Sequence, residues 1–212
     1  YFEIEKEALG SSFLFPVIGN HEAVLGLFTF GLEPYWDILF HTQNNYLHER
    51  NWSINIGRFG IIGIDKYATN WSQPAALEWF ETELARLDEL SDWLIVAMHE
   101  PMYTCSNHSP WKQALELLGP IMEANKVDLV FAGHNHCYEH FDANGVDYIV
   151  TGGGGAPLYG IEECEPLGEE TMVSSGKFYH YVLLETAGDL LNVSVVEAET
   201  GDLFETWSLE IN

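Results

Sequence analysis

Residues 128–136 read Asp-Leu-Val-Phe-Ala-Gly-His-Asn-His, and this stretch decides how the rest of the chain is interpreted. Its first five residues form a mainly apolar run that predicts a short buried strand. The strand ends at Gly133, where a sharp loop can begin, and His134 and His136 follow on that loop. Two imidazoles at this spacing can point into one pocket, and histidine is the commonest protein ligand for metals. The pair predicts a metal site, with two solvated surface histidines as the alternative.

Two further apolar runs end in polar side chains of the same kind. Residues 13–18 are followed by a glycine and then by Asn20, whose amide oxygen is a hard metal ligand. Residues 93–98 are followed by His99, and Pro101 prevents a central strand from continuing beyond it. The sequence therefore predicts that Asn20 and His99 lie at strand ends and project beyond the sheet.

Helical patterns separate these strands. Residues 72–74, Ser-Gln-Pro, form a helix start signal, and residues 77–90 then place leucines at helical spacing. A second helix is expected over about residues 110–125, and residues 53–64 predict a hairpin. Such alternation predicts an α/β fold, in which ligands bind beyond the carboxyl ends of the strands. The side chains at that kind of position are Asn20, His99, His134 and His136.

The last third of the chain predicts a second sheet. Its three strands are expected at residues 178–185, 191–196 and 203–209. Residues 152–155 are all glycine, which permits the backbone to approach a ligand or the histidine loops closely. Residues 23–50 follow no regular period and are expected to form a long excursion that lines a substrate cleft. Nothing repeats or resembles a linker, so we expect one domain over residues 1–212.

The charge balance limits the partners of the protein. The chain has 33 Asp and Glu but only 8 Lys and Arg, a formal net charge of −25. This field repels polyanions, so binding to nucleic acid or to an anionic membrane is not expected. An anionic substrate would need bound cations to reverse the field locally. The alternative reading of the acidic excess is solubility, or a salty or acidic habitat.

Cysteines and glycosylation sequons bear on the cellular compartment. Cys105 and Cys164 could form a disulfide that leaves Cys137 free, but the sequence does not fix this pairing. Four Asn-x-Ser sequons fit a secreted glycoprotein, and they also fit coincidence in a cytoplasmic protein. The sequons begin at Asn51, Asn70, Asn107 and Asn192.

Several of these motifs together resemble one known family. Residues 19–22 (Gly-Asn-His-Glu), 99–101 (His-Glu-Pro) and 133–139 (Gly-His-Asn-His-Cys-Tyr-Glu) resemble, in order and spacing, the calcineurin-like metallophosphoesterase superfamily. The likeness is greatest to its purple acid phosphatase branch and to prokaryotic relatives of that branch. Asp65 at the end of an apolar strand, and residues 151–159, are also similar to recurrent features of that group.

The resemblance implies a fold and a cofactor. The fold is an α/β/β/α sandwich, with two mixed β-sheets flanked by helices, and here it would lack its first strands. The chain would then be about the carboxyl-terminal two-thirds of the family's catalytic domain. The cofactor is a pair of divalent or trivalent metal ions, Fe, Zn or Mn, beyond the strand ends. Such a pair can clamp the attacking and leaving oxygens of a phosphoryl transfer.

The resemblance also implies roles for individual residues. One ion would be held by Asn20, His99 and His134, and His136 would belong to the second ion. Two further histidines would be catalytic: His21 would stabilise the phosphoryl group or protonate the leaving oxygen, and His108 would contact the substrate.

The chain departs from the family pattern in two places. An Asp-x-His motif and a Gly-Asp motif, which carry further metal ligands, should precede Asn20, but residues 1–19 contain neither Asp nor His. Relatives also often carry Arg at the position of Glu139 or His140. We therefore expect either an incomplete amino-terminal segment or a chain that has lost these ligands.

Two hypotheses follow for function. The first is metal-dependent hydrolysis of small phosphoesters at a two-metal site, with a phosphodiesterase or nucleotide pyrophosphatase as a variant of it. The second is a catalytically degenerate, secreted structural or binding protein that keeps the fold. A sheet without its first strands would expose its edges, so completion by a missing amino-terminal segment or by a second copy of the chain is expected.

Overall fold

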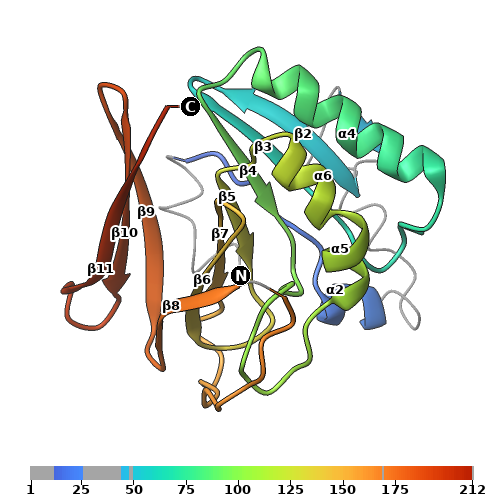
Figure 1. Ribbon diagram of the computed structural model, residues 1–212. Helices are drawn as coiled ribbons and strands as arrows, with labels where there is room; N and C mark the ends of the chain where they lie inside the picture. Colours follow the sequence, from blue (N-terminus) through green and yellow to red (C-terminus); the bar gives the residue numbers. More distant parts are fainter. Residues whose placement is uncertain (1–11, 26–43, 48–49, 169, 212) are drawn as a thin grey trace.

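The computed structural model describes all residues except 1–11, 26–43, 48–49, 169 and 212. The described residues form two sheets and a set of helices (Figure 1). The helices are α2 (Asn20–Leu25), α4 (Pro74–Asp88), α5 (Lys112–Leu117) and α6 (Gly119–Ala124). The strands of the large sheet are β1 (Asn44–Tyr46), β2 (Asn51–Ile56), β3 (Phe59–Gly63), β4 (Trp93–Ala97), β5 (Leu129–Ala132), β6 (Tyr138–Ala143), β7 (Val146–Thr151) and β8 (Thr171–Gly176). The strands of the small sheet are β9 (His180–Ala187), β10 (Leu190–Glu197) and β11 (Leu203–Glu210).

The large sheet has a parallel centre and antiparallel edges. Its strand order is β1-β2-β3-β4-β5-β7-β6-β8, and β3, β4, β5 and β7 run parallel to one another. The predicted hairpin is β2–β3, which pairs Ile54 with Ile61. Strands β3, β4 and β5 are apolar throughout because both faces of the sheet are covered. The carboxyl ends of β4 and β5 therefore lie side by side, as the predicted α/β alternation requires.

Helices cover one face of this sheet. Helix α4 begins at Pro74, as predicted, and buries Phe80, Leu84 and Leu87 against the sheet. The predicted helix over residues 110–125 is instead two short helices, α5 and α6, which meet at Leu118. Pro120 explains the break, because it occupies the first turn of α6 and cannot donate a backbone hydrogen bond to the preceding turn.

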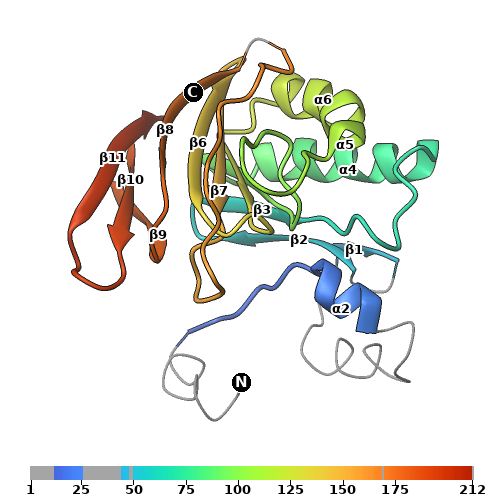
Figure 2. The same cartoon turned by 90° about the horizontal axis from the view of Figure 1, so that it is seen from below.

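The small sheet covers the other face of the large sheet (Figure 2). Its strands are antiparallel throughout and occupy the three predicted positions. Leu191, Val193 and Val195 of β10 pack against Ile95 and Leu129 of the large sheet. The chain therefore has the expected α/β class, and its described residues form three layers: helices, large sheet and small sheet.

The strands β1, β6 and β8 of the large sheet were not predicted, and β1 lies within residues 23–50, which were expected to form an irregular excursion. β6 and β8 carry polar side chains that obscure the strand pattern in the sequence. In β6, Glu139 and His140 are nevertheless buried, because other parts of the fold supply their hydrogen-bond partners. None of the helices in the described residues has the length and apolar character needed to span a membrane.

Candidate metal centre

Asn20 and His99 meet at the carboxyl end of the large sheet. Asn20 begins α2, His99 follows β4, and the Asn20 Oδ1 atom lies 2.8 Å from His99 Nε2. The strand predicted over residues 13–18 was wrong: these residues form neither strand nor helix, and Pro16 among them cannot donate to a strand ladder. Gly19 permits this contact, because a Cβ atom there would lie 2.9 Å from His99 Cε1. The carboxylate of Glu22 accepts a hydrogen bond from the Gly19 N–H group at 3.0 Å and holds this turn in place. The two predicted ligands, far apart in sequence, are thus brought together.

His134 lies next to this pair in a strained backbone conformation. Its φ angle is +63°, in the left-handed region that residues with a Cβ rarely adopt. The backbone N–H of Gly133 donates to the His99 carbonyl at 2.9 Å, which joins the two strand ends. The His134 ring centroid then lies 5.0 Å from that of His99 and 4.2 Å from that of His108. Strain of this kind is typical of functional loops.

His136 is oriented by the loop that contains the glycine run. Its Nδ1 atom lies 2.9 Å from the carbonyl oxygen of Pro157, so Nδ1 carries the proton and Nε2 keeps a free lone pair. Its ring stacks on Tyr159 at 4.2 Å. Gly152 allows the loop to come this close, because a Cβ atom there would lie 1.9 Å from the Asn135 carbonyl oxygen. The predicted close approach of the glycine run to the histidine loop is confirmed at this position.

Burial keeps the two central imidazoles neutral. It lowers the pKa of His134 to about 4, against a smaller opposing effect of Glu100. Burial also lowers the pKa of His99, and repulsion from His21 and His136 adds to the decrease. A metal ion binds the neutral form of imidazole, so these shifts favour metal binding near neutral pH.

The two predicted catalytic histidines lie at the border of this cluster. His21 is exposed in the first turn of α2, close enough to His99 to affect its pKa. His108 is also exposed, and its ring lies between the rings of His134 and Tyr159. Both can therefore face a ligand that approaches the cluster from solvent.

These donors fit a metal ion in part. They are an amide oxygen and imidazole nitrogens, which bind Zn and Fe readily. No group of three or more His, Cys, Asp or Glu side chains that could hold a metal is found in the part of the chain that the structure describes. Asp65 does not supply a carboxylate, because it is buried against Arg50 at 2.6 Å and caps backbone amides of its own loop. The donors that converge here are thus neutral, and the anionic ligand that two close cations need is not among them.

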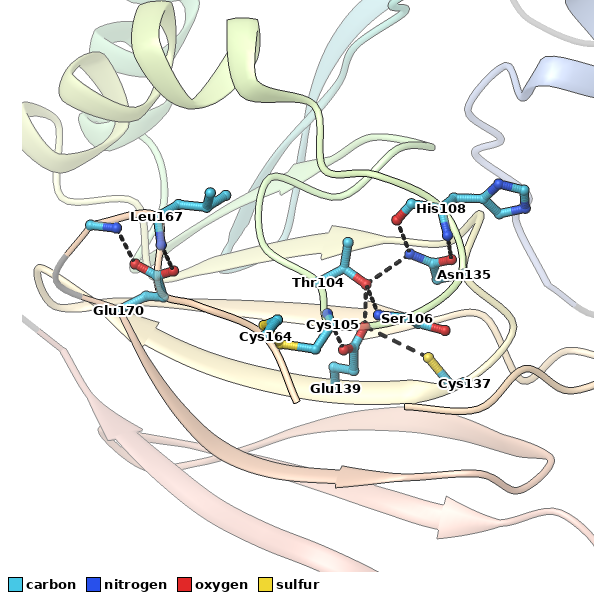
Figure 3. Close-up of a disulfide and its surroundings, with 11 residues drawn as sticks. Thr104, Cys105, Ser106, His108, Asn135, Cys137, Glu139, Cys164, Leu167 and Glu170 are labelled. Atoms are coloured by element: carbon cyan, nitrogen blue, oxygen red, sulfur yellow. Dashed lines mark hydrogen bonds between the residues drawn. A yellow bond between two sulfur atoms is a disulfide. The ribbon is translucent and has the colours of Figure 1, made fainter. Parts of the chain in front are cut away.

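Sequence reasoning assigned no role to two residues in this region. Tyr159 contacts both His108 and His136, and Asn135 lies between the two ligand histidines. The sequence signals for Tyr159 were its place after the glycine run and within residues 151–159, which resemble a recurrent feature of the family. The disulfide between Cys105 and Cys164, which the sequence left open, is present beside these loops, and Cys137 is free and buried (Figure 3).

The chain matches a family of known proteins. The family model of calcineurin-like phosphoesterases matches residues 3–138, which include every histidine of the cluster. The chain belongs to the calcineurin-like phosphoesterase family. Within this family it is similar to purple acid phosphatases: it is 39% identical over 67 residues to Purple acid phosphatase 7 of Arabidopsis thaliana, a match that covers 32% of this chain and 20% of that protein.

Two further relatives extend the comparison. The chain is 31% identical over 177 residues to Acid phosphatase A of Cryphonectria parasitica, a match that covers 71% of this chain and 33% of that protein. Its fold is similar to that of the purple acid phosphatase PPD1 from yellow lupin, with a TM-score of 0.71 at 19% identity over 82% of this chain and 35% of the lupin chain. The phosphoesterase chain described here therefore spans about a fifth to a third of the length of these relatives.

Proposed function

We propose that this protein hydrolyses phosphate esters at a two-metal site. The observation that carries the proposal is the convergence of Asn20, His99 and His134, three neutral donors from separate segments, at the carboxyl edge of the large sheet. Membership of the phosphoesterase family and similarity to acid phosphatases support the same reaction class. A small phosphoester is the proposed substrate.

The metal ions would be held by the residues that converge there. Asn20, His99 and His134 would bind one ion, and His136 would bind the second through its free Nε2 atom. When bound, the ions would supply Lewis-acid stabilisation of phosphoryl oxygens and activation of water, with Fe, Zn or Mn as candidates. Further ligands for the second ion would come from outside the described residues.

The chain's own residues would do the rest. The exposed ring of His108 would donate a hydrogen bond to a phosphoryl oxygen, whose negative charge grows in the transition state. His21, exposed in the first turn of α2, would give a proton to the leaving oxygen as a general acid. The bound metal ions would offset locally the net negative charge of the protein, which otherwise repels an anionic substrate.

The alternative is a non-catalytic protein that keeps the fold. Its motivation is the lack of a bridging carboxylate in the residues described here, but the relatives above carry the names of phosphatases, which favours the enzyme. A phosphodiesterase would share the same donors and differ in the cleft expected of residues 23–50, of which residues 26–43 and 48–49 lie outside the described part of the chain.

An extracellular, glycosylated protein is part of the proposal. The Cys105–Cys164 disulfide supports it, because disulfides persist in oxidising compartments. Asn51 is excluded as a glycan acceptor in the folded protein, since its side chain is fully buried and bonded to Thr69. Asn70 and Asn107 are exposed, and glycopeptide mass spectrometry of the native protein would show whether they carry glycans.

Replacement of one ligand tests the proposed reaction. In the protein expressed from its complete gene, His134→Ala should lower kcat on an aryl phosphate by more than about 10²-fold, since loss of a metal's outer-shell partners alone costs about 10–100-fold. His180→Asn is the control, because it removes a buried imidazole outside the cluster. No turnover by the parent protein on monoesters or diesters would refute the proposal, as would equal losses in the two variants.

A further inference from the structure

The side chain of Asn135 is committed to a single neighbouring segment. It is fully buried, and its Oδ1 atom accepts a hydrogen bond from the His108 N–H group at 2.8 Å (Figure 3). Its Nδ2 atom donates to the His108 carbonyl at 3.0 Å and to the Thr104 hydroxyl at 2.7 Å. One amide therefore holds both backbone polar groups of His108.

Glu139 fixes the other end of the same segment. Its buried carboxylate accepts hydrogen bonds from the Thr104 hydroxyl at 2.5 Å and from the Cys105 N–H group at 2.6 Å. Thr104 thus donates to Glu139 while it accepts from Asn135, so the two side chains act on one hydroxyl (Figure 3). The disulfide to Cys164 holds Cys105 from a third direction.

The ring of His108 has no comparable support. It is exposed, and its described contacts are with the rings of His134 and Tyr159. Its position therefore depends on its backbone, and that backbone depends on Asn135. Asn135 also lies between His134 and His136, so a single loop sets the distance between the proposed metal ligands and His108.

We propose that Asn135 is a positioning residue, which holds His108 at the substrate side of the metal-binding loop. This inference rests on the proposed function, because it takes His108 to contact the phosphoryl group. Only an amide fits the contacts, since it must offer one acceptor and two donors at once. An aspartate would keep the acceptor but lose both donors and would face the His108 carbonyl with a negative oxygen.

A double-mutant cycle between Asn135 and His108 tests the proposal. Asn135→Ala should leave the metal-to-protein ratio unchanged. It should lower kcat/KM on an aryl phosphate by about 10–10²-fold, as expected when a group that contacts the substrate is misplaced. Competitive inhibition by inorganic phosphate should weaken to a similar extent. His108→Ala should have a comparable effect, and the double variant should be no worse than His108→Ala. The proposal would be overturned if the fold loss in kcat/KM of the double variant equalled the product of the two single losses. An Asn135→Ala enzyme with unchanged kcat/KM would also overturn it.

Two further variants cover the case in which Asn135→Ala does not fold. Asn135→Asp should reproduce the loss in kcat/KM, and Thr104→Val, which keeps both Asn135–His108 bonds, should cost less than Asn135→Asp. The reverse order would refute the assignment. Amide hydrogen exchange of His108 gives a readout without turnover. In Asn135→Asp the acceptor for the His108 N–H group remains, but repulsion between the new carboxylate and the His108 carbonyl should separate the two segments, so the His108 amide should exchange faster than in the parent protein. Equal protection in the two proteins would contradict the proposal. If the parent protein lacks turnover, the proposed function fails, while the exchange result still reports on Asn135.

Discussion

His134 and His140 lie on the same short segment, but the fold places them in opposite electrostatic environments. Burial lowers the pKa of His134 to about 4. Burial opposes protonation of His140 as well, but the hydrogen bonds that His140 donates to Asp147 and Glu205 outweigh it and raise the pKa of His140. Neighbouring carboxylates therefore decide the charge of a buried imidazole in this protein. A neutral imidazole such as His134 can bind a metal, whereas an imidazole between carboxylates, such as His140, is protonated more readily.

His140 joins the two sheets. His140 Nε2 lies 3.1 Å from Asp147 Oδ1 in β7, and its Nδ1 lies 3.0 Å from Glu205 Oε1 in β11. Its ring stacks on Trp207 at 4.4 Å, and the Trp207 indole donates to Asp147 at 2.8 Å. Tyr138 also donates to Glu205, at 2.6 Å. When protonated, His140 thus places a positive charge between Asp147 and Glu205.

The largest expected effect is the loss of stability when His140, which joins the two sheets, is removed. His140→Ala removes the cation between two partly buried carboxylates and should lower the free energy of unfolding by about 3–5 kcal/mol, the usual cost of leaving a buried charge unpaired. Chemical denaturation at pH 6 measures it. His140→Arg is the matched variant and should recover part of the loss; if His140→Ala costs less than about 1 kcal/mol, the sheets are not joined by this contact.

A smaller effect concerns pH. The pKa of His140 is raised in the folded protein, so its contribution is complete below the ordinary histidine value of 6.5 and is lost as pH rises through the folded value. The pKa of Glu205 is lowered, because hydrogen bonds from Ser174, Tyr138 and His140 outweigh the opposite effect of burial. Its contribution is present above the ordinary value of 4.5 and is lost as pH falls through the folded value.

The pair should therefore be most stabilising between about pH 4.5 and 6.5. Above this window, stability should fall by at most about 1.4 kcal/mol per pH unit for one proton. Unfolding midpoints measured across pH 4–9 would show the fall, and His140→Gln should remove it. A parent protein and a His140→Gln variant with identical pH profiles would contradict this assignment.

The smallest expected effect is the change in stability of the metal-free protein when the His134 side chain is removed. His134→Gly removes the side chain and relieves the positive φ angle, so stability without added metal should stay the same or rise by up to about 1 kcal/mol. Thermal unfolding of metal-free protein measures it. A loss of more than about 2 kcal/mol would show that His134 supports the fold rather than a ligand. The variant should still lose its metal, which separates the two roles.

Much of the fold could be predicted from the sequence because the central strands are covered on both faces. β3, β4 and β5 are continuous apolar runs, and the stripe of α4 follows a helical period. β6 was missed because Glu139 and His140 are polar, and only the folded structure shows the partners that permit their burial. The prediction of a single helix over residues 110–125 was wrong because Pro120 interrupts the helical hydrogen bonds and lies in the first turn of a second helix, α6.

The candidate site divides in the same way. Strand-end position identified His99 and His134, because parallel strands bring their carboxyl ends to one edge. Asn20 was identified from a predicted strand that the structure does not contain, and it reaches the same edge from the start of α2. Asn135 was not identified, since its importance lies in three contacts with a segment distant in sequence. Whether these side chains bind metal stays a prediction.

Anomalous diffraction at the absorption edge of the bound metal, from crystals of the protein expressed from its complete gene, would test the account most directly. We expect a peak bounded by Asn20 Oδ1, His99 Nε2 and the His134 ring, with metal–nitrogen distances of about 2.0–2.2 Å. A metal peak elsewhere in the molecule, or a fully loaded protein whose metal does not contact His99 and His134, would contradict it.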